Sequence, residues 1–304
     1  MKIRNHSRFG PIFLLILAVA VFNRCKKDPA TEPVTNPPVV SKVQFLGHKG
    51  SGSTLVNPSI IENTLPSIQK ALTTLSGVEL DLQMSLDGTL WVYHDFDLAD
   101  ESCTPISSRS LILSHDSEIS KINVCSPKAQ DRIYKLSEII SYWNQAATPF
   151  YISIHIKLDF PPDSINKPTI GGEALYLAKM ADNLAMLIPS VKTPGKIILE
   201  VYDATFCKKI HQLIPGMKVC LIKYVPFPKQ IESALASGYD GVSAIYTNPE
   251  LTIEEVTRAH NNGLFVQLWT PNTKAELTTA YNFLPDFIQT DNMDALKDLN
   301  LTAK

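Results

Sequence analysis

The sequence has no excess of charge of either sign. Of its 304 residues, 28 are lysine or arginine and 30 are aspartate or glutamate, so the formal net charge at pH 7 is −2. This balance argues against a nucleic-acid partner and against electrostatic attachment to an anionic membrane. No glycine-rich phosphate fingerprint follows the first predicted strand, which argues against a nucleotide-binding open sheet. No feature of the sequence predicts an oligomeric state.

The N-terminal apolar segment, residues 11–22, is too short to span a bilayer comfortably. It follows a basic stretch with Lys2, Arg4 and Arg8, as in a secretory signal, and Cys25 comes directly after it. This arrangement resembles a bacterial lipoprotein signal, in which the cysteine is lipidated. We therefore expect a signal peptide over residues 1–24, and a lipid-attachment cysteine with a proline-rich, disordered tether over residues 25–41. The alternative is an uncleaved or ordinarily cleaved signal.

Either alternative takes the chain out of the cytoplasm. With lipidation at Cys25, we expect a periplasmic, outer-membrane or cell-surface lipoprotein of a bacterium, attached to the membrane only through its lipid.

Cysteine is scarce, with four residues besides Cys25, and outside the cytoplasm these can oxidise. Cys103 and Cys125 flank an irregular, serine-rich segment, so we expect them to pair. Cys207 lies near a predicted helix start and Cys220 within the next predicted strand. These two either form a second disulfide or remain as buried thiols.

The segment from Gly77 to Asp95 carries the first chemical signal. Glu79, Asp81 and Gln83 alternate with Val78, Leu80 and Leu82, as the two sides of a strand do. Asp87-Gly88 predicts a two-residue hairpin turn, in which residue i faces residue 175 − i and His94 lies opposite Asp81. The neighbouring carboxylates of Glu79 and Asp81 repel each other unless a cation lies between them. The pattern therefore predicts a metal site; a solvent-facing acidic strand edge is the alternative.

From residue 42 onward, strand and helix patterns alternate, which predicts parallel strands joined by right-handed helical crossovers. Eight strands result if the hairpin arm 89–94 is set aside, and nine otherwise. Seven of the predicted strands cover residues 43–48, 150–157, 196–202, 217–223, 241–245, 264–270 and 286–289. The remaining strand, second along the chain, begins at residue 77. The first predicted helix ends at residue 75. The others cover residues 136–146, 172–188, 203–213, 229–237, 252–261, 274–283 and 293–299.

This count predicts an α/β fold, a (β/α)₈ TIM barrel over residues 42–304 with a hairpin after strand 2 and an irregular insertion around 96–133. The roughly 260 residues agree with a barrel, for which about 250 are typical. A doubly wound open sheet is the alternative. Polar residues gather at the predicted C-terminal strand ends, where barrel sites lie. They are His48, Glu79, Asp81, His155, Lys157, Glu200, Gln267 and Trp269.

A series of short motifs resembles the glycerophosphodiester phosphodiesterase family in content and order. They are Gly47-His48-Lys49-Gly50, Glu62-Asn63-Thr64, Glu79-Leu80-Asp81, Asp87-Gly88, His94-Asp95, Ile156-Lys157, Trp269-Thr270-Pro271-Asn272 and Thr290-Asp291. The resemblance implies a (β/α)₈ barrel that hydrolyses glycerophosphodiesters to an alcohol and sn-glycerol 3-phosphate. It also implies a divalent cation, often Ca²⁺ or Mg²⁺, and a small-molecule phosphodiester substrate.

Residue roles follow from the same resemblance. His48 and His94 would be the general acid and base, and Glu79 and Asp81 metal ligands. Lys157 would bind the phosphate, Asn63 would support the site and Trp269 would line the substrate pocket.

Two positions depart from the family pattern. Lys49 stands where the family usually has arginine; it keeps the charge for phosphate binding but loses the bidentate fork. His155 stands where the family has a glutamate metal ligand, which shifts the expected preference toward Zn²⁺ or Mn²⁺. Glu200 on the next strand is a candidate for the missing carboxylate. A weakened barrel that only binds a phosphorylated ligand, or an enzyme for lysophospholipid-type substrates, are the alternative functions.

Overall fold

The computed structural model describes residues 43–107, 109–158 and 160–301. Its main element is a closed barrel of eight parallel strands, in which β1 pairs with both β2 and β12. The barrel strands are β1 (Gln44–Gly47), β2 (Gly77–Met84), β7 (Tyr151–Ile156), β8 (Ile197–Val201), β9 (Lys218–Ile222), β10 (Gly241–Ile245), β11 (Phe265–Trp269) and β12 (Phe287–Thr290). The predicted (β/α)₈ barrel is therefore confirmed, and the open sheet is not formed.

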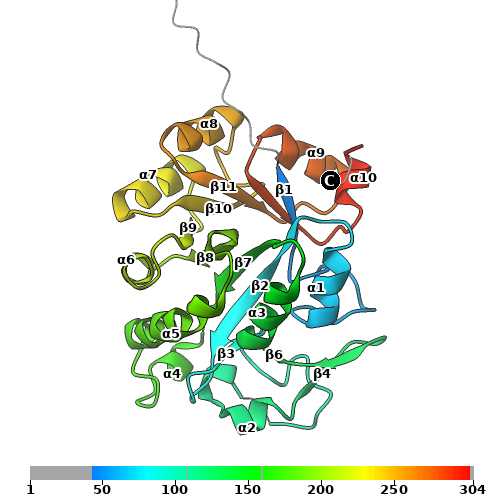
Figure 1. Ribbon diagram of the computed structural model, residues 1–304, viewed down its shortest axis with the longest axis vertical. Helices are drawn as coiled ribbons and strands as arrows, with labels where there is room; N and C mark the ends of the chain where they lie inside the picture. Colours follow the sequence, from blue (N-terminus) through cyan, green and yellow to red (C-terminus); the bar gives the residue numbers. More distant parts are fainter. Residues whose placement is uncertain (1–42, 108, 159, 302–304) are drawn as a thin grey trace, which may run out of the picture. The chain divides into compact units, whose positions relative to one another are not determined.

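Helices cover the outside of the strands (Figure 1). They are α1 (Leu65–Ala71), α3 (Leu136–Gln145), α5 (Glu173–Leu187), α6 (Ala204–Leu213), α7 (Phe227–Ser237), α8 (Ile253–Asn261), α9 (Lys274–Asn282) and α10 (Ala295–Asp298), with short turns α2 (Asp116–Ile119) and α4 (Pro162–Ile165) and 3₁₀ segments Leu111–Leu113, Ile188–Ser190 and Pro194–Lys196. Helix α1 begins at Leu65 because Thr64 is its N-cap, accepting a hydrogen bond from the Ser67 amide, and it ends at Ala71, before the predicted residue 75. No helix within the described residues is long and apolar enough to cross a membrane.

Inward-facing side chains form layers inside the barrel. The layer at the N-terminal end is apolar, and its buried members Leu46, Ile198, Cys220 and Phe287 pack with Tyr151 and Phe265. Gly241 makes room there, because a Cβ at this position would lie 2.7 Å from the Phe265 ring. Above it lies a buried polar layer of Ser153, Glu200, Ser243, Gln267 and Gln289. The apolar layer closes the barrel at one end, so polar chemistry is confined to the other.

The hairpin after β2 has a different register from the one predicted. Strand β3 (Leu90–Val92) pairs with β2 so that Leu82 faces Val92, and the Tyr93 amide donates to the Asp81 carbonyl at 3.0 Å. Tyr93, and not His94, therefore lies opposite Asp81. The prediction was wrong by one residue because the loop has three residues, 86–88, with Gly88 at φ 83°.

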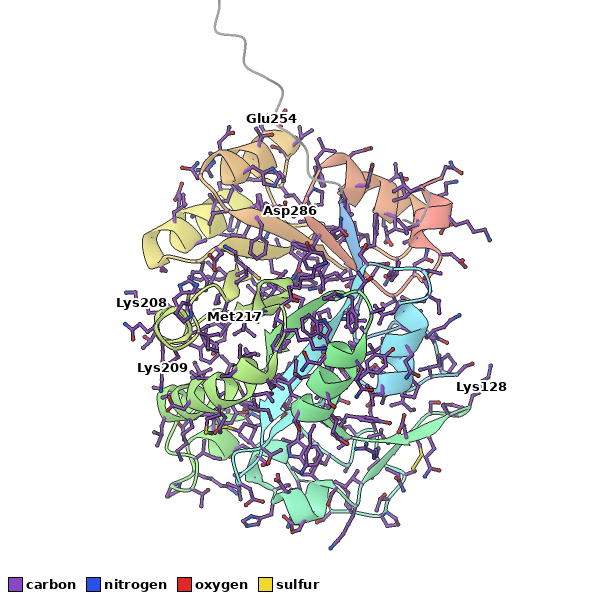
Figure 2. The ribbon with its side chains drawn as sticks, viewed as in Figure 1. Lys128, Lys208, Lys209, Met217, Glu254 and Asp286 are labelled. Carbon is purple, nitrogen blue, oxygen red and sulfur yellow. A yellow bond between two sulfur atoms is a disulfide. The ribbon has the colours of Figure 1, made fainter. Side chains whose placement is uncertain are left out.

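The insertion is more ordered than the sequence predicted. Strands β4 (Asn123–Cys125) and β5 (Gln130–Arg132) form a separate hairpin, with Lys128 near its turn (Figure 2), and β6 (Tyr134–Lys135) pairs with β3. Its apolar residues form a second small core with the β3 hairpin arm and with Ile61 from the loop between β1 and α1. The members of this core are Ile61, Trp91, Tyr93, Leu98, Leu111, Ile119, Ile122, Val124 and Ile133. The insertion is thus fixed to the barrel by packing of its own.

The cysteines divide as follows. Cys103 and Cys125 form a disulfide, with their Cα atoms 5.6 Å apart, which links the insertion to its hairpin. Cys207 and Cys220 are buried free thiols. They belong to different cores, outside and inside the barrel wall, so pairing is prevented by the strands between them. The predicted signal, Cys25 and the tether lie outside the described residues.

Glu101 in the insertion gives a prediction for stability. Burial, followed by the nearby Glu62 and Asp95 carboxylates, raises its pKa from 4.5 to about 8. A carboxyl group whose pKa is raised on folding contributes fully to stability at pH values below its pKa in the unfolded chain. This contribution is lost as the pH rises through the folded-state pKa of about 8. We expect Glu101→Gln to raise the free energy of unfolding by about 1–2 kcal/mol near pH 9 and to leave it almost unchanged near pH 5.

Urea unfolding at both pH values measures this effect. Glu232→Gln, an exposed position on α7, is the control and should change neither midpoint. An equal shift of the Glu101→Gln midpoint at both pH values would contradict the assignment of a strongly raised pKa.

Candidate active site

A pocket of about 150 Å³ opens at the C-terminal end of the barrel. Most of the residues around it come from the last two positions of a strand or from the loop directly after it, whereas Glu79 and Asp81 lie in the middle of the longer strand β2. The lining residues are His48, Glu79, Asp81, His94, His155, Lys157, Glu200, Ile222, Tyr224, Trp269 and Gln289. Seven of the eight barrel strands contribute, because the inward side of each parallel strand ends at the same rim. The structure thus brings together most of the residues that the sequence marked.

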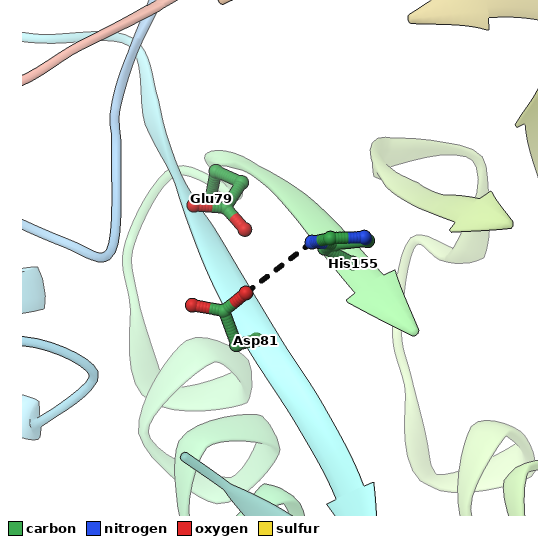
Figure 3. A group of neighbouring side chains, drawn as sticks. All are labelled: Glu79, Asp81 and His155. Carbon is green, nitrogen blue, oxygen red and sulfur yellow. Dashed lines mark ion pairs between the residues drawn. The ribbon is translucent and has the colours of Figure 1, made fainter. Parts of the chain in front are cut away.

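Glu79, Asp81 and His155 form a cluster on one wall of the pocket (Figure 3). One ligand atom from each lies within 4.8 Å of the others, and His155 Nδ1 is 3.3 Å from Asp81 Oδ1. The register of β2 and β7 accounts for this contact, since Asp81 pairs directly with His155. His155 is therefore the third member of this cluster, beside the two carboxyl groups of β2.

The pKa values of the two carboxyl groups in the cluster are shifted in opposite directions. Burial, together with the Asp81 and Glu200 carboxylates, raises the pKa of Glu79 well above its usual value. Burial alone would also raise the pKa of Asp81, but hydrogen bonding to His155 and the charges of His94 and Lys157 hold it well below its usual value. Two buried carboxylates so close together do not both ionise without added positive charge.

Asn63 fixes the position of Asp81. Its side-chain amide donates to Asp81 Oδ2 at 3.1 Å, and its carbonyl oxygen accepts from the Asp81 backbone amide at 3.0 Å. Asn63 has a φ of 58°, in the left-handed region where asparagine is tolerated better than most residues. This double contact orients the carboxylate from outside the pocket.

The cluster fits a divalent cation. It offers carboxylate oxygens and an imidazole nitrogen at mutually close positions, and the repulsion between Glu79 and Asp81 would be relieved by positive charge. A mixed oxygen and nitrogen set of this kind suits transition-metal ions and Zn²⁺ better than an all-carboxylate set would.

His48, directly after β1, is held by a carboxylate. Its Nδ1 lies 2.8 Å from Asp291 Oδ1, and its Nε2 lies 3.9 Å from Glu79 Oε2 on the pocket side. Burial alone would raise the Asp291 pKa, but hydrogen bonds from His48, the Ser53 amide and the Asn272 side chain hold it below its usual value. An ionised Asp291 accepts a hydrogen bond from Nδ1–H of His48 and leaves Nε2 facing the site.

His94 has the same arrangement on the other side of the pocket. Its Nδ1 lies 2.6 Å from Asp95 Oδ1. The chain leaves the ladder after Val92, and Gln83 holds the following loop through its side-chain amide, which donates to the Tyr93 and Asp95 carbonyls at 3.0 and 2.8 Å. Besides His155 in the acidic cluster, the pocket therefore contains two imidazoles, His48 and His94, each with its Nδ1 on an aspartate that lies outside that cluster.

The two predicted phosphate-binding lysines differ in position. Lys157 lies at the pocket, directly after β7. Lys49 is buried, its Nζ lies 2.6 Å from Glu62 Oε1, and it is not among the residues that line the pocket. Its backbone amide instead donates to Glu79 Oε2 at 2.9 Å. Lys49 is thus connected to the site by the hydrogen bond from its backbone amide to Glu79.

Glu200 lies at the floor of the pocket, outside the close cluster. Oε1 accepts hydrogen bonds from Ser153 at 2.7 Å and Gln289 at 2.6 Å, and Oε2 accepts one from Ser243 at 2.7 Å. These contacts satisfy a buried charge and fix the carboxylate in the polar layer. As a compensating metal ligand Glu200 stays a prediction.

Trp269 lines the pocket as the resemblance implies, and Tyr224 stands beside it. Their rings meet edge to face, with centroids 5.7 Å apart. Tyr224 was not among the predicted site residues, although it lies two residues beyond the inward-facing Ile222. Asp95 and Asp291 stood in the family motifs without a predicted role, and Gln289 was not predicted. The two-residue alternation marks Gln289 within its strand, and continued past the strand ends it would have marked Asp291 and Tyr224.

Two other histidines lie at the opposite end of the barrel. His211 Nε2 is 2.9 Å from Asp240, and His260 Nε2 is 2.9 Å from Asp286, the aspartate labelled in Figure 2. Each aspartate stands just before a strand. Each aspartate also accepts a backbone amide from the neighbouring strand. These pairs join helices to strands.

The fold and this rim of acidic groups, imidazoles and lysine define a barrel hydrolase of phosphate esters. The chain belongs to the glycerophosphoryl diester phosphodiesterase family, whose model matches residues 48–295. It is therefore a phosphoric diester hydrolase, as the motifs implied. No curated protein matches the chain.

Solved structures share the fold. A glycerophosphodiester phosphodiesterase from Parabacteroides distasonis is 16% identical with a TM-score of 0.67, covering 86% of this chain and 98% of its own. The enzyme from Thermotoga maritima is 20% identical, with a TM-score of 0.61 and coverage of 85% and 98%. A phosphodiesterase from Oleispira antarctica, in complex with the product sn-glycerol-3-phosphate, is 17% identical, with a TM-score of 0.66 and coverage of 84% and 96%.

Proposed function

We propose that the chain hydrolyses glycerophosphodiesters to an alcohol and sn-glycerol 3-phosphate, with a divalent cation at Glu79, Asp81 and His155 and acid–base catalysis by His48 and His94. The observation that carries the proposal is the pair of aspartate-bound imidazoles facing one pocket with the acidic cluster. The product seen in the Oleispira antarctica enzyme, which has the same fold, supports this choice of reaction.

The histidines transfer the protons of the reaction. One imidazole takes at Nε2 the proton of the attacking hydroxyl, which belongs to water or to the substrate's own glycerol, as its oxygen bonds to phosphorus. The other gives a proton to the oxygen of the leaving alcohol as that P–O bond breaks; where the glycerol attacks first, water then opens the cyclic phosphate by the same proton transfers in reverse. The Nδ1 atoms of the two rings are held by Asp291 and Asp95, so Nε2 is the exchanging atom on both. Because both rings are held in the same way, His48 and His94 are proposed as an acid–base pair, with neither role assigned to one ring.

Positive charge is needed at the non-bridging phosphate oxygens. Lys157 supplies it from the strand β7 side, and Glu79, Asp81 and His155 would hold the cation. When bound, the cation stabilises the charge of the transition state as a Lewis acid. Lys49 supports the cluster from outside the pocket. Its backbone amide donates to Glu79, and its ion pair with Glu62 holds Lys49 itself in place. Mn²⁺ and Zn²⁺ are the proposed ions, because of the imidazole.

The assay is release of glycerol 3-phosphate from glycerophosphocholine. The purified chain is treated with a chelator and then supplied separately with Ca²⁺, Mg²⁺, Mn²⁺ and Zn²⁺. We expect no product after chelation and recovery with at least one cation, and the double variant His48→Ala/His94→Ala is the control. A parent rate equal to that of the double variant with every cation would overturn the proposal in favour of a barrel that only binds phosphorylated ligands.

A further inference from the structure

The two proposed acid–base imidazoles are attached to the barrel in different ways. His48 is held by Asp291, which lies 243 positions away in the sequence and directly follows β12, so its ring is fixed to a barrel strand. His94 is held by Asp95, the next residue along the chain. A hydrogen bond between neighbouring residues moves with the segment that carries both of them. The position of His94 therefore depends on what attaches that segment to the barrel.

The backbone around His94 has left the sheet. Strand β3 ends at Val92, and the Tyr93 amide still donates to the Asp81 carbonyl at 3.0 Å. Residues 93–95 belong to no strand or helix, and we call them the His94 turn. The His94 side chain is 34% exposed, so packing alone does not fix it. The turn needs hydrogen bonds to hold its shape.

The side chain of Gln83 joins the His94 turn to β2. Its amide nitrogen donates to the Tyr93 carbonyl at 3.0 Å and to the Asp95 carbonyl at 2.8 Å, and the His94 carbonyl lies 3.4 Å away. The carbonyls of three successive residues thus converge on one nitrogen atom. Gln83 itself is fully buried, and in the ladder of β2 and β3 it lies opposite Trp91. Its amide therefore ties the turn to a rigid part of the barrel.

The same strand carries the proposed cation ligands. Glu79 and Asp81 belong to β2 (Figure 3), and Gln83 stands two residues further along, so its side chain leaves the strand on the same side. Strand β2 therefore sets the position of the acidic cluster directly and that of His94 through Gln83. An acid or base must lie within hydrogen-bond reach of the proton that it transfers, and a misplacement of about 1 Å can cost on the order of 10²-fold in rate.

We propose that Gln83 is a positioning residue, which holds His94 at the pocket for proton transfer. This inference rests on the proposed function, because it requires His94 to act as an acid or base. Gln83 is not among the residues that line the pocket, so it acts through the His94 turn and not on the substrate. Its loss should displace His94 and leave His48, which Asp291 holds, in place.

A double-mutant cycle in the full-length chain tests this role. Gln83→Met nearly keeps the length of the side chain but removes its donors. We expect it to lower kcat for glycerophosphocholine by about 10- to 100-fold with KM almost unchanged. In the His94→Ala background the same substitution should cost less than about threefold, because the ring that it positions is absent. Equal losses in both backgrounds would overturn the proposal.

Gln230→Met is the matched control. Gln230 on α7 is also fully buried, and its amide donates to the Leu221 carbonyl at 2.9 Å and the Ser243 carbonyl at 2.7 Å. The side-chain carbonyl oxygens of Gln83 and Gln230 both lack a hydrogen-bond partner among the described residues. A loss caused by weaker folding would appear in both variants, whereas we expect only Gln83→Met to lose activity. A similar loss in Gln230→Met would overturn the proposal. If Gln83→Met does not fold, Gln83→Asn, which keeps the amide but shortens its reach, takes its place in the cycle.

A spectroscopic measurement separates this inference from the proposed function. The Cε1–H signals of His94 and His48 are identified by nuclear magnetic resonance as those missing from His94→Ala and His48→Ala. We expect Gln83→Met to shift or broaden the His94 signal and to leave the His48 signal in place. An unchanged His94 signal would overturn the inference even in a chain that cleaves glycerophosphocholine. A changed His94 signal in a chain that cleaves no glycerophosphodiester would reject the proposed function and support Gln83 as the residue that holds the turn.

Discussion

Replacing His48 by alanine is expected to lower kcat/KM for glycerophosphocholine by about 10²–10⁴-fold, the usual contribution of a positioned acid or base. The ring is held through Nδ1 by Asp291 and presents Nε2 to the pocket, and the variant leaves no other group at that place. The loss should appear mainly in kcat, since proton transfer belongs to the transition state. Steady-state kinetics in the presence of saturating cation measures it.

His260→Ala is the matched control for this prediction. His260 also pairs with an aspartate, Asp286, at 2.9 Å, and its side chain is 32% exposed compared with 24% for His48, but it lies at the opposite end of the barrel. Loss of a His–Asp pair as such would affect both variants. We expect only His48→Ala to lose activity, while both keep a cooperative unfolding transition. A His48→Ala enzyme with the parent rate would remove this residue from the mechanism.

The barrel was predictable because its strands and helices carry strong, regular patterns. Strand β10 has the predicted bounds, 241–245, and α3 ends one residue before the predicted 146. Each short buried strand is followed by an amphipathic helix, and this order allows few topologies besides parallel ones. The hairpin register was not predictable in the same way, because two- and three-residue loops both accept glycine at position 88.

The insertion shows a different limit of sequence reasoning. Its strands have three residues each, too few for an alternating pattern, and its core draws on distant residues such as Ile61 and Trp91. Side chains that meet only through tertiary packing leave no local period. For this reason an irregular segment was the expected reading, although the structure contains a hairpin with a core of its own.

The candidate site was largely predictable for the same physical reason as the barrel. Inward-facing positions recur every second residue, so Glu79 with Asp81 and His155 with Lys157 were assigned to one rim. The partners of these groups were harder to predict. The contact between His48 and Asp291 joins residues 243 positions apart, which no local pattern records. Lys49 turns toward Glu62 because the buried carboxylate needs a counter-charge, a requirement that appears only in three dimensions.

His155→Glu is expected to change which cation the enzyme uses. The parent offers two carboxylates and one imidazole, a set that favours Mn²⁺ or Zn²⁺, whereas a third carboxylate at the same corner favours Ca²⁺ or Mg²⁺. In the parent, chelation should remove activity by about 10³-fold, consistent with several kcal/mol of transition-state stabilisation. The measurement is the activity of the chelated enzyme titrated with each cation in turn.

The geometry favours a true exchange of ligands at this position. His155 lies in register with Asp81, with 3.3 Å between Nδ1 and Oδ1, so a glutamate on the same inward position points at the same cluster. His155→Gln is the control, because it removes the imidazole without adding charge; it should weaken Zn²⁺ and Mn²⁺ activation and gain none from Ca²⁺. If His155→Glu keeps the parent's order of cations, His155 is no ligand. The imidazole then acts only as a partner that keeps Asp81 ionised, and the cation is bound by the two carboxylates of β2.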